Sequence, residues 1–363
     1  MSMIKNLLSK KDNKIQSYDD FWAWFQTQQK SFHKVVKNSG NIEKDFFNKL
    51  SPKFDELKEG YFFLTGLADE NTVKLVFTAD GAIRNFVFVD ELVQAAPSIE
   101  GWKFTAHKPS LDVEDVAINM EGFQFKQDNL SFYPNENPAY PDEIDITVVH
   151  ADFAERHRSA IINGVYIFLD NYLGELNFAT MVDYLKVDAK PLNPPELIPI
   201  KKLKDYLIWR QKEFIEKYEG IRHDTENDNY GSFEGELENG NPLLAIMNTD
   251  LLQWDSKASH PWILKIDIKY DTSSNSGLPD DDTYALMDAM ENEMNNELRD
   301  SEGYLNIGRQ TADGLREIYY GCKDFRKSSR VAFNICQKYK GTLDIDYDVF
   351  KDKYWRVLNQ FMT

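Results

Sequence analysis

The sequence predicts an α+β protein, with an N-terminal antiparallel sheet on which helices pack and a C-terminal ferredoxin-like domain preceded by a β-hairpin. Residues 262–270 alternate apolar and polar side chains, which is the period of a half-buried strand. Residues 283–298 repeat apolar side chains at helical spacing. With the segments that follow, they give the order strand, helix, strand, strand, helix, strand, which is the split βαβ arrangement.

The N-terminal half combines helical and strand patterns. Residues 1–14 are polar, and we expect them to be loose. A helix is predicted over residues 18–36 with Ser17 as its N-cap, because a serine side chain can accept a hydrogen bond from the first turn. A second helix is predicted over 42–57. The remaining predicted elements are strands over 60–67, 72–78, 102–106, 117–125, 144–149 and 182–187, and helices over 86–96 and 158–173.

Four prolines mark a boundary after these segments, at Pro191, Pro194, Pro195 and Pro199. Proline removes a backbone donor and stiffens the chain, which favours a connection between domains. A helix over 200–218 and a polar linker over 222–230 follow. We therefore expect a loose terminus (1–14), an α+β domain (15–190), a boundary region (191–229) and a C-terminal domain (230–363).

The C-terminal domain is expected to begin with a hairpin, because strand patterns over 233–237 and 243–247 flank Asn239-Gly240, a pair typical of a two-residue turn. The six ferredoxin-like elements follow, and Asp313-Gly314 joins the two central strands. The expected helix over 283–298 carries a stripe of three methionines (Met287, Met290 and Met294). Helical spacing favours a core position for the stripe, and an adaptable partner-binding face is the alternative.

Composition limits the classes of protein to consider. The formal net charge is −18, which repels phosphate backbones, so we predict no nucleic-acid binding. Such a surface suits a basic protein partner, or simply keeps the protein in solution. The two cysteines, Cys322 and Cys336, predict neither a disulfide framework nor a zinc site. No signal peptide or membrane-spanning run is apparent, and we predict a cytoplasmic protein.

No familiar catalytic motif is present: the sequence lacks a phosphate loop, a dinucleotide fingerprint and a nucleophile elbow. His150, Asp152, Glu155 and His157 lie close together, but their spacing matches no zinc pattern, and a polar loop with Asp152 as a helix cap is preferred. The run 280–282 is similarly predicted to begin a helix, where the helix dipole favours carboxylates, and not to hold a cation. We predict no metal and no cofactor.

The turn at Asp313-Gly314 is the candidate binding site, with Arg309, Asp313, Arg316 and Glu317 as its residues. A two-residue turn pairs Arg309 with Ile318, Ile307 with Tyr320 and Leu305 with Cys322. This register puts the apolar side chains on one face of the hairpin, together with Arg309 and Arg316. Gln310 and Glu317 lie on the other face. The alternative to a recognition site is turn chemistry with cross-strand charge pairing.

The same hairpin carries a family resemblance. Its motifs are Tyr304, Gly308-Arg309, Thr311, Asp313-Gly314, Arg316-Glu317 and Tyr319-Tyr320, accompanied by the hairpin over 239–247, the helix start over 277–279 and the pair Asp352 and Trp355. With these motifs, residues 230–363 resemble the bacterial domain of unknown function 695 family. The chain departs from the family pattern at Gly321 and Cys322, where a third aromatic residue is common. Motifs over 78–81, 91–97 and 101–102 resemble segments that accompany this family.

The family has no assigned catalytic residue, so the resemblance supplies none. Domains of this kind are distantly similar to regulator of ribonuclease E activity B, a small acidic ferredoxin-like protein that inhibits an endoribonuclease by binding it. The first hypothesis is therefore a protein-binding or regulatory protein that acts through its acidic surface, for example an inhibitor of a nuclease or a toxin. The alternatives are an enzyme with a pocket between the two domains, using Arg309, Glu317 and His260, and a structural oligomer.

Overall fold

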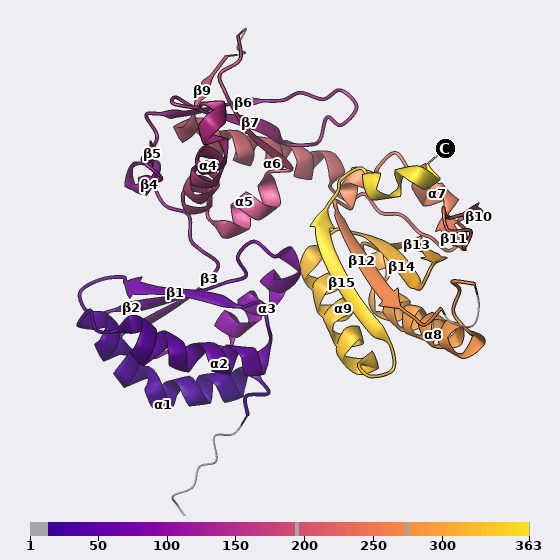
Figure 1. Cartoon of the computed structure of the whole chain (residues 1–363), viewed down its shortest axis with the longest axis horizontal. Coiled ribbons are helices and arrows are strands. Elements are labelled where there is room, and N and C mark those ends of the chain that lie inside the picture. Colours follow the sequence, from indigo (N-terminus) through magenta and orange to yellow (C-terminus); the bar gives the residue numbers. More distant parts are fainter. Residues whose placement is uncertain (1–13, 193–195, 273–275, 363) are drawn as a thin grey trace, which may run out of the picture. The chain divides into compact units, whose positions relative to one another are not determined.

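The computed structural model describes residues 14–192, 196–272 and 276–362, which form two compact units that divide between Pro109 and Ser110 (Figure 1). Helices and strands are both abundant, so the predicted α+β class is confirmed. Of the predicted loose terminus, only Lys14 lies among the described residues. The predicted boundaries at residues 190 and 230 stay a prediction.

The first unit packs helices on a three-stranded sheet of order β1-β2-β3. Helix α1 begins after Ser17, whose Oγ accepts a hydrogen bond of 3.1 Å from the amide of Asp20, as predicted. The core is built largely from aromatic rings contributed by helices and strands alike, which bury a large apolar area. The elements are α1 (Tyr18–Lys37), a π-helical turn (Glu43–Phe47), α2 (Asn48–Leu57), β1 (Phe62–Leu67), β2 (Val73–Thr78), α3 (Ile83–Gln94) and β3 (Trp102–Ala106).

The second unit begins with a four-stranded sheet of order β8-β7-β6-β9 and a separate hairpin, β4-β5. The hairpin replaces the single strand predicted over 117–125, because Glu121 and Gly122 both adopt positive φ and reverse the chain. The elements are β4 (Ile118–Met120), β5 (Phe123–Phe125), β6 (Leu130–Pro134), β7 (Asp145–His150), α4 (Arg158–Leu173), α5 (Glu175–Met181), β8 (Tyr184–Asp188), β9 (Ile198–Pro199) and α6 (Leu203–Tyr218).

The prediction of one antiparallel N-terminal sheet is wrong, because residues 62–199 form two main sheets and each contains a parallel pair of strands. Strand β2 pairs in parallel with β3, and β7 pairs in parallel with β8. In both cases a helical connection (α3, or α4 with α5) joins the paired strands. Such a crossover returns the chain to the same end of the sheet, which imposes the parallel direction.

The last part of the second unit is a six-stranded sheet of order β10-β11-β13-β14-β12-β15, in which all neighbours are antiparallel. The predicted element order is present, and the ferredoxin-like assignment itself stays a prediction. The elements are β10 (Tyr230–Glu236), β11 (Pro242–Asn248), α7 (Thr249–Leu252), β12 (Trp262–Lys269), α8 (Asp281–Glu297), β13 (Tyr304–Ala312), β14 (Leu315–Cys322), α9 (Phe325–Tyr339) and β15 (Asp344–Lys351).

The two faces of this sheet are covered differently. Helices α8 and α9 lie on one face, and Met287, Met290 and Met294 of α8 are completely buried there, which confirms the core interpretation of the methionine stripe. On the other face, α7 and the 3-10 helix Arg356–Phe361 cover a second apolar cluster centred on Trp355. Hairpin β10-β11 extends the sheet past α8, so part of the helix-covered face is left accessible.

Turn geometry fixes the register of both hairpins in this sheet. Asp313 and Gly314 have positive φ and join Ala312 to Leu315, as the two-residue turn predicts. The Asn239-Gly240 turn is longer than predicted, because the backbone bond that closes it runs from the Leu237 amide to the Asn241 carbonyl. The pairing of Arg309 with Ile318 is confirmed.

A β-bulge at Ile307 changes the register of β13 against β14 further from the turn. Tyr304 pairs with Cys322, in place of the predicted Leu305, and Leu305 lies opposite Gly321. The bulge adds one residue to β13 without a partner, so the predicted positions of Leu305 and Ile307 were wrong by one residue. Both side chains therefore join the Trp355 cluster on the other face.

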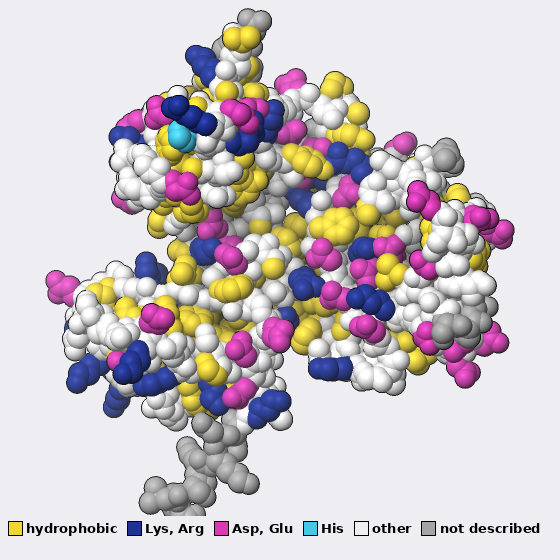
Figure 2. Space-filling view, in the orientation of Figure 1, with side chains coloured by type: hydrophobic (Ala, Val, Ile, Leu, Met, Phe, Trp, Pro, Cys, Tyr) yellow, Lys and Arg dark blue, Asp and Glu magenta, His cyan; other side chains and the backbone are white. Residues whose placement is uncertain are grey.

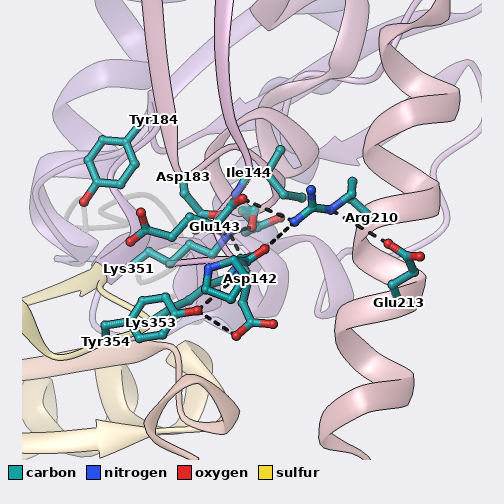
Figure 3. A network of polar contacts seen from close by, with 12 residues as sticks. Asp142, Glu143, Ile144, Asp183, Tyr184, Arg210, Glu213, Lys351, Lys353 and Tyr354 are labelled. Atoms are coloured by element: carbon teal, nitrogen blue, oxygen red, sulfur yellow. Dashed lines mark hydrogen bonds and ion pairs between the residues drawn. The ribbon is translucent and has the colours of Figure 1, made fainter. Parts of the chain in front are cut away.

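A buried polar network joins the segment 142–184 to the end of β15 (Figure 3). Asp183 makes ion pairs of 2.8 Å with both Lys351 and Lys353. Asp142 accepts hydrogen bonds from Lys217, Tyr218 and Tyr354 at 2.7 to 2.8 Å. Within the second unit, these contacts fasten the four-stranded part to the six-stranded part.

Candidate functional site

The accessible part of the helix-covered face lies where hairpin β10-β11 meets α8. Strand register places Glu234, Leu244, Thr311 and Arg316 opposite one another in one row across four strands. Residues that face each other across neighbouring strands share a face, so their side chains form one surface. The next row contains Ser232, Ile246, Arg309 and Ile318 in the same order.

These rows form the floor of a pocket of about 270 Å³, which we call the Arg316 pocket. Its walls come from the start of α8 and the loop before it. The lining residues are Leu244, Ile246, Leu278, Pro279, Asp281, Tyr284, Arg309, Thr311 and Arg316. Leu244 and Ile246 remain 40% and 37% exposed, so the floor offers apolar surface to a ligand.

Arg316 is a fully buried cation in the lining of this pocket. Its Nη1 donates to Asp288 Oδ1 at 2.9 Å, its Nε donates to Thr311 Oγ1 at 3.1 Å, and its guanidinium lies 4.5 Å from the centre of the Tyr284 ring. Its Nη2 is buried and has no hydrogen-bond partner among the described residues. A buried donor without an acceptor is costly, so a ligand that brings an acceptor gains free energy here.

Arg309 lies beside Arg316 on the same face, but its guanidinium is already paired. Its Nη1 donates to Glu291 Oε2 at 2.9 Å, and its Nη2 lies 3.6 Å from Asp288. Burial opposes the charge of Arg309, but Glu291 and the neighbouring acidic groups outweigh it and raise the pKa of the guanidinium. Arg309 thus holds α8 on the sheet, and the free donor belongs to Arg316.

The other two predicted site residues lie away from this pocket. Asp313 is at the tip of the β13-β14 hairpin, where it accepts hydrogen bonds from the side-chain amides of Asn241 at 2.7 Å and Asn239 at 3.1 Å. Glu317 lies on the opposite face of the sheet, where it pairs with Lys265 at 2.5 Å. Of the four residues, the structure therefore brings together Arg309 and Arg316 only.

His260, a candidate for the enzyme alternative, is completely buried. Its ring lies 5.3 Å from that of Trp254, and its backbone carbonyl accepts a hydrogen bond of 3.0 Å from Trp355 Nε1. Its Nδ1 shares a hydrogen bond of 2.8 Å with Ser259 Oγ. Burial, assisted by the nearby charge of Lys323, lowers the pKa of His260 to about 3. The histidine is therefore neutral at ordinary pH, and it does not share a surface with Arg309 or Glu317.

The rims of the Arg316 pocket are acidic. Hairpin β10-β11, from Tyr230 to Asn248, contains three glutamates and neither lysine nor arginine. Helix α8 contains six acidic residues and again no lysine or arginine. Figure 2 shows Asp and Glu side chains gathered over the hairpin and α8 at the right-hand edge of the view. We call the exposed Glu234 and Glu236 on one side, with Asp281 and Asp282 on the other, the acidic rims.

Within the described ranges of the chain, no group of three or more His, Cys, Asp or Glu side chains has the geometry to hold a metal ion. His150 instead accepts from the amide of Asp152, and Asp280 caps α8 by accepting from the Thr283 amide at 2.7 Å. Among the described helices, none is both long and apolar enough to cross a lipid bilayer.

Comparison with known proteins agrees with the resemblance seen in the sequence. Residues 234–363 match the model of a family of unknown function (DUF695), so the predicted resemblance of the C-terminal part is confirmed. No curated protein and no solved structure matches the chain. The matched residues contain the whole lining of the Arg316 pocket.

Several residues of this pocket were not predicted from the sequence. Tyr284, Leu278 and Pro279 lie in a predicted helix start, and nothing local indicates that they wall a pocket. Leu244 and Ile246 alternate with Ala245 and Met247, so a strand apolar on both faces could have been noticed. Such a strand either packs on both sides of the sheet or leaves one side for a partner.

Proposed function

We propose that the C-terminal part of this protein is a protein-binding module that takes a basic segment of a protein partner at the Arg316 pocket and its acidic rims. The module acts by contact and not by chemistry on a substrate. The observation that carries the proposal is the combination of exposed apolar floor residues with two flanking elements that lack lysine and arginine.

Charge and apolar surface have separate roles in this proposal. Burial of partner side chains on Leu244 and Ile246 supplies affinity, since removing apolar surface from water is favourable. The acidic rims attract and orient lysine or arginine side chains that flank the apolar residue, and they disfavour acidic partners. Because the rims are exposed, their contribution weakens as salt screens them.

The partner proposed is a cytoplasmic protein with an exposed basic segment, such as a nuclease or a toxin that the module inhibits. Support for inhibition comes from the acidity of the module and from the distant similarity to regulator of ribonuclease E activity B. A net charge of −18 keeps nucleic acids away, so a nucleic acid is not the proposed ligand.

Photo-crosslinking inside the producing cells tests this proposal. Tyr230 is replaced by p-benzoylphenylalanine, because this tyrosine is exposed and lies on the pocket side of β10. We expect one reproducible adduct, in which mass spectrometry places the crosslink in a lysine- or arginine-rich segment of the partner.

The matched control carries the same replacement at Tyr166, an exposed tyrosine on α4. The proposal requires that the Tyr166 variant not give the same adduct. Equal labelling from both positions, or an adduct whose crosslinked segment is acidic, would contradict the proposal.

A further inference from the structure

The Arg316 pocket has the size of an anchor for one side chain. Its volume of about 270 Å³ is below the range of about 300–1,000 Å³ that is usual for whole ligands and cofactors. The apolar part of its lining, Leu244, Ile246, Leu278 and Pro279, suits an aliphatic group. A single aliphatic side chain from a docked segment therefore fits the pocket better than a free small molecule.

The unpartnered Nη2 of Arg316 indicates what accompanies that side chain. The atom is buried, and its guanidinium is held in place by Asp288, Thr311 and the Tyr284 ring. Asp288 and Glu291 pair with the two arginines, and Asp281 lines the same pocket, so another anion would meet repulsion. A neutral carbonyl oxygen can accept from Nη2 without that penalty.

We propose that the Arg316 pocket binds one aliphatic residue of the partner segment, with a backbone carbonyl of that segment accepting a hydrogen bond from Arg316 Nη2 and basic residues on either side meeting the acidic rims. This inference rests on the proposed function and adds the chemistry of the ligand. The recognised sequence is a leucine-like residue flanked by lysine or arginine.

A synthetic peptide makes this testable without knowledge of the natural partner. The probe is N-acetylated, C-amidated Lys-Lys-Ser-Leu-Ser-Lys-Lys, compared with one peptide that has serine in place of leucine and one that has glutamate in place of each lysine. Binding to the full chain is followed by methyl NMR at low salt, on the signals of Leu244, Ile246 and Leu278. The guanidinium signals of Arg316 report the carbonyl hydrogen bond.

We expect saturable shifts of these methyl and guanidinium signals with the leucine peptide. The serine peptide should bind at least about tenfold more weakly, because burial of a leucine side chain contributes the corresponding free energy. Leu244→Trp fills the pocket and should abolish the difference between the two peptides. Leu64→Trp, on an exposed leucine of β1, should leave it unchanged.

The outcomes separate this inference from the proposed function. Equal binding of the leucine and serine peptides would overturn the anchor, while binding of a basic peptide at the acidic rims would stand. Absence of saturable shifts with either lysine peptide, or tighter binding of the glutamate peptide, would overturn both. Shifts confined to residues outside the Arg316 pocket would also reject the anchor.

Discussion

At the scale of single residues, His260 is buried with one ring nitrogen bonded to Ser259 and the other, Nε2, without a partner among the described residues. Its pKa is lowered to about 3, whereas an unfolded chain holds histidine near pH 6.5. The unfolded state therefore takes up a proton first as the pH falls. The folded protein therefore has its full stability, as far as His260 affects it, above about pH 6.5. The free energy of unfolding then falls progressively as the pH is lowered toward 3.

We therefore expect the free energy of unfolding to fall by about 2 kcal/mol from this histidine alone when the pH is lowered from about 6.5 to about 4.5. Urea unfolding of the parent protein and of His260→Gln at both pH values measures the difference. Glutamine does not titrate, so the fall in the free energy of unfolding should be smaller in the variant than in the parent protein by that amount. Identical losses in the two proteins would show that His260 is accessible to protons in the folded state.

Gly308 is the residue that the β-bulge of β13 requires. Its φ is 141°, and a Cβ there would lie 2.4 Å from the carbonyl oxygen of Ile246 in the neighbouring strand. Gly308→Ala should therefore lower the free energy of unfolding by about 3 kcal/mol, since overpacking and backbone strain add. Urea unfolding measures this.

The control for that prediction is Gly235→Ala in β10. A Cβ at Gly235 meets only the Leu243 Cβ, at 4.0 Å, and its backbone is ordinary. This substitution should change stability by less than about 1 kcal/mol in either direction. Equal effects of the two substitutions would contradict the described bulge.

Local chemistry at this scale could be read from the sequence, and pairing at a distance could not. Ser17 was predicted as a cap because the signal lies within one turn of helix. The pairing of Arg309 with Glu291 depends on how α8 lies on the sheet, which no spacing in the chain encodes. The partner of Arg316 was missed for the same reason.

At the scale of elements, the two hairpins of the six-stranded sheet are joined at their tips. Asp313 accepts from Asn239 and Asn241 of the other turn, and its φ of 46° is one that Asp and Asn adopt more readily than other side chains. This predicted binding residue thus connects β13-β14 to β10-β11, which forms the floor of the Arg316 pocket.

Asp313→Ala should lower the free energy of unfolding by about 2 kcal/mol, because two hydrogen bonds and a favourable turn residue are lost together. Thermal and urea unfolding measure this. Asp313→Asn keeps an acceptor and the turn preference, so it should cost less than about 1 kcal/mol. If Asp313→Ala left the free energy of unfolding unchanged, the two hairpin tips would not be coupled. Asp313 would then again be a candidate recognition residue.

Elements with a strong period were predicted well, and connections were not. Strand β12 and helices α8 and α4 lie within a few residues of their predicted ranges, because their apolar periods are uninterrupted. The hairpin β4-β5 was missed because its strands have three residues each, too few to show a period. Strand direction in the first two sheets depends on crossover helices and not on the strands themselves.

At the scale of the second unit, the polar network around Asp183 joins its two parts (Figure 3). Lys353 is almost completely buried, and burial together with the charge of Lys351 lowers its pKa to about 8. For Asp183, burial raises the pKa, but the two lysines outweigh it and the net pKa is lowered. The carboxylate therefore compensates two buried amines.

Asp183→Asn leaves both lysines without this carboxylate, so we expect a loss of about 3 kcal/mol or more at neutral pH. Asp188→Asn is the matched control, because Asp188 is 27% exposed and pairs with exposed Lys186 at 2.6 Å, and should cost less than about 1 kcal/mol. Unfolding in urea measures the effect of each substitution, and hydrogen exchange follows the four-stranded and the six-stranded sheet separately. Equal losses would contradict a structural role of the network.

The contacts that join Asp142 and Asp183 to Tyr354 and Lys353 could not have been predicted, since they span 212 and 170 positions of the chain. Asp352 and Trp355 belong to the family pattern, and Lys353 and Tyr354 between them contact residues outside the matched range 234–363. The sequence identifies the motif as part of the family pattern, but only the folded structure shows its contact with Asp142 and Asp183.

The salt dependence of peptide binding tests the central claim most directly. The affinity of the leucine-containing lysine peptide is measured between about 50 mM and about 500 mM salt, for the parent protein and for Glu234→Gln with Glu236→Gln. We predict a steep fall of affinity with salt in the parent and a weaker, flatter dependence in the double variant. Affinity that is independent of salt, or a salt dependence that the double variant leaves unchanged, would contradict a basic partner at the acidic rims.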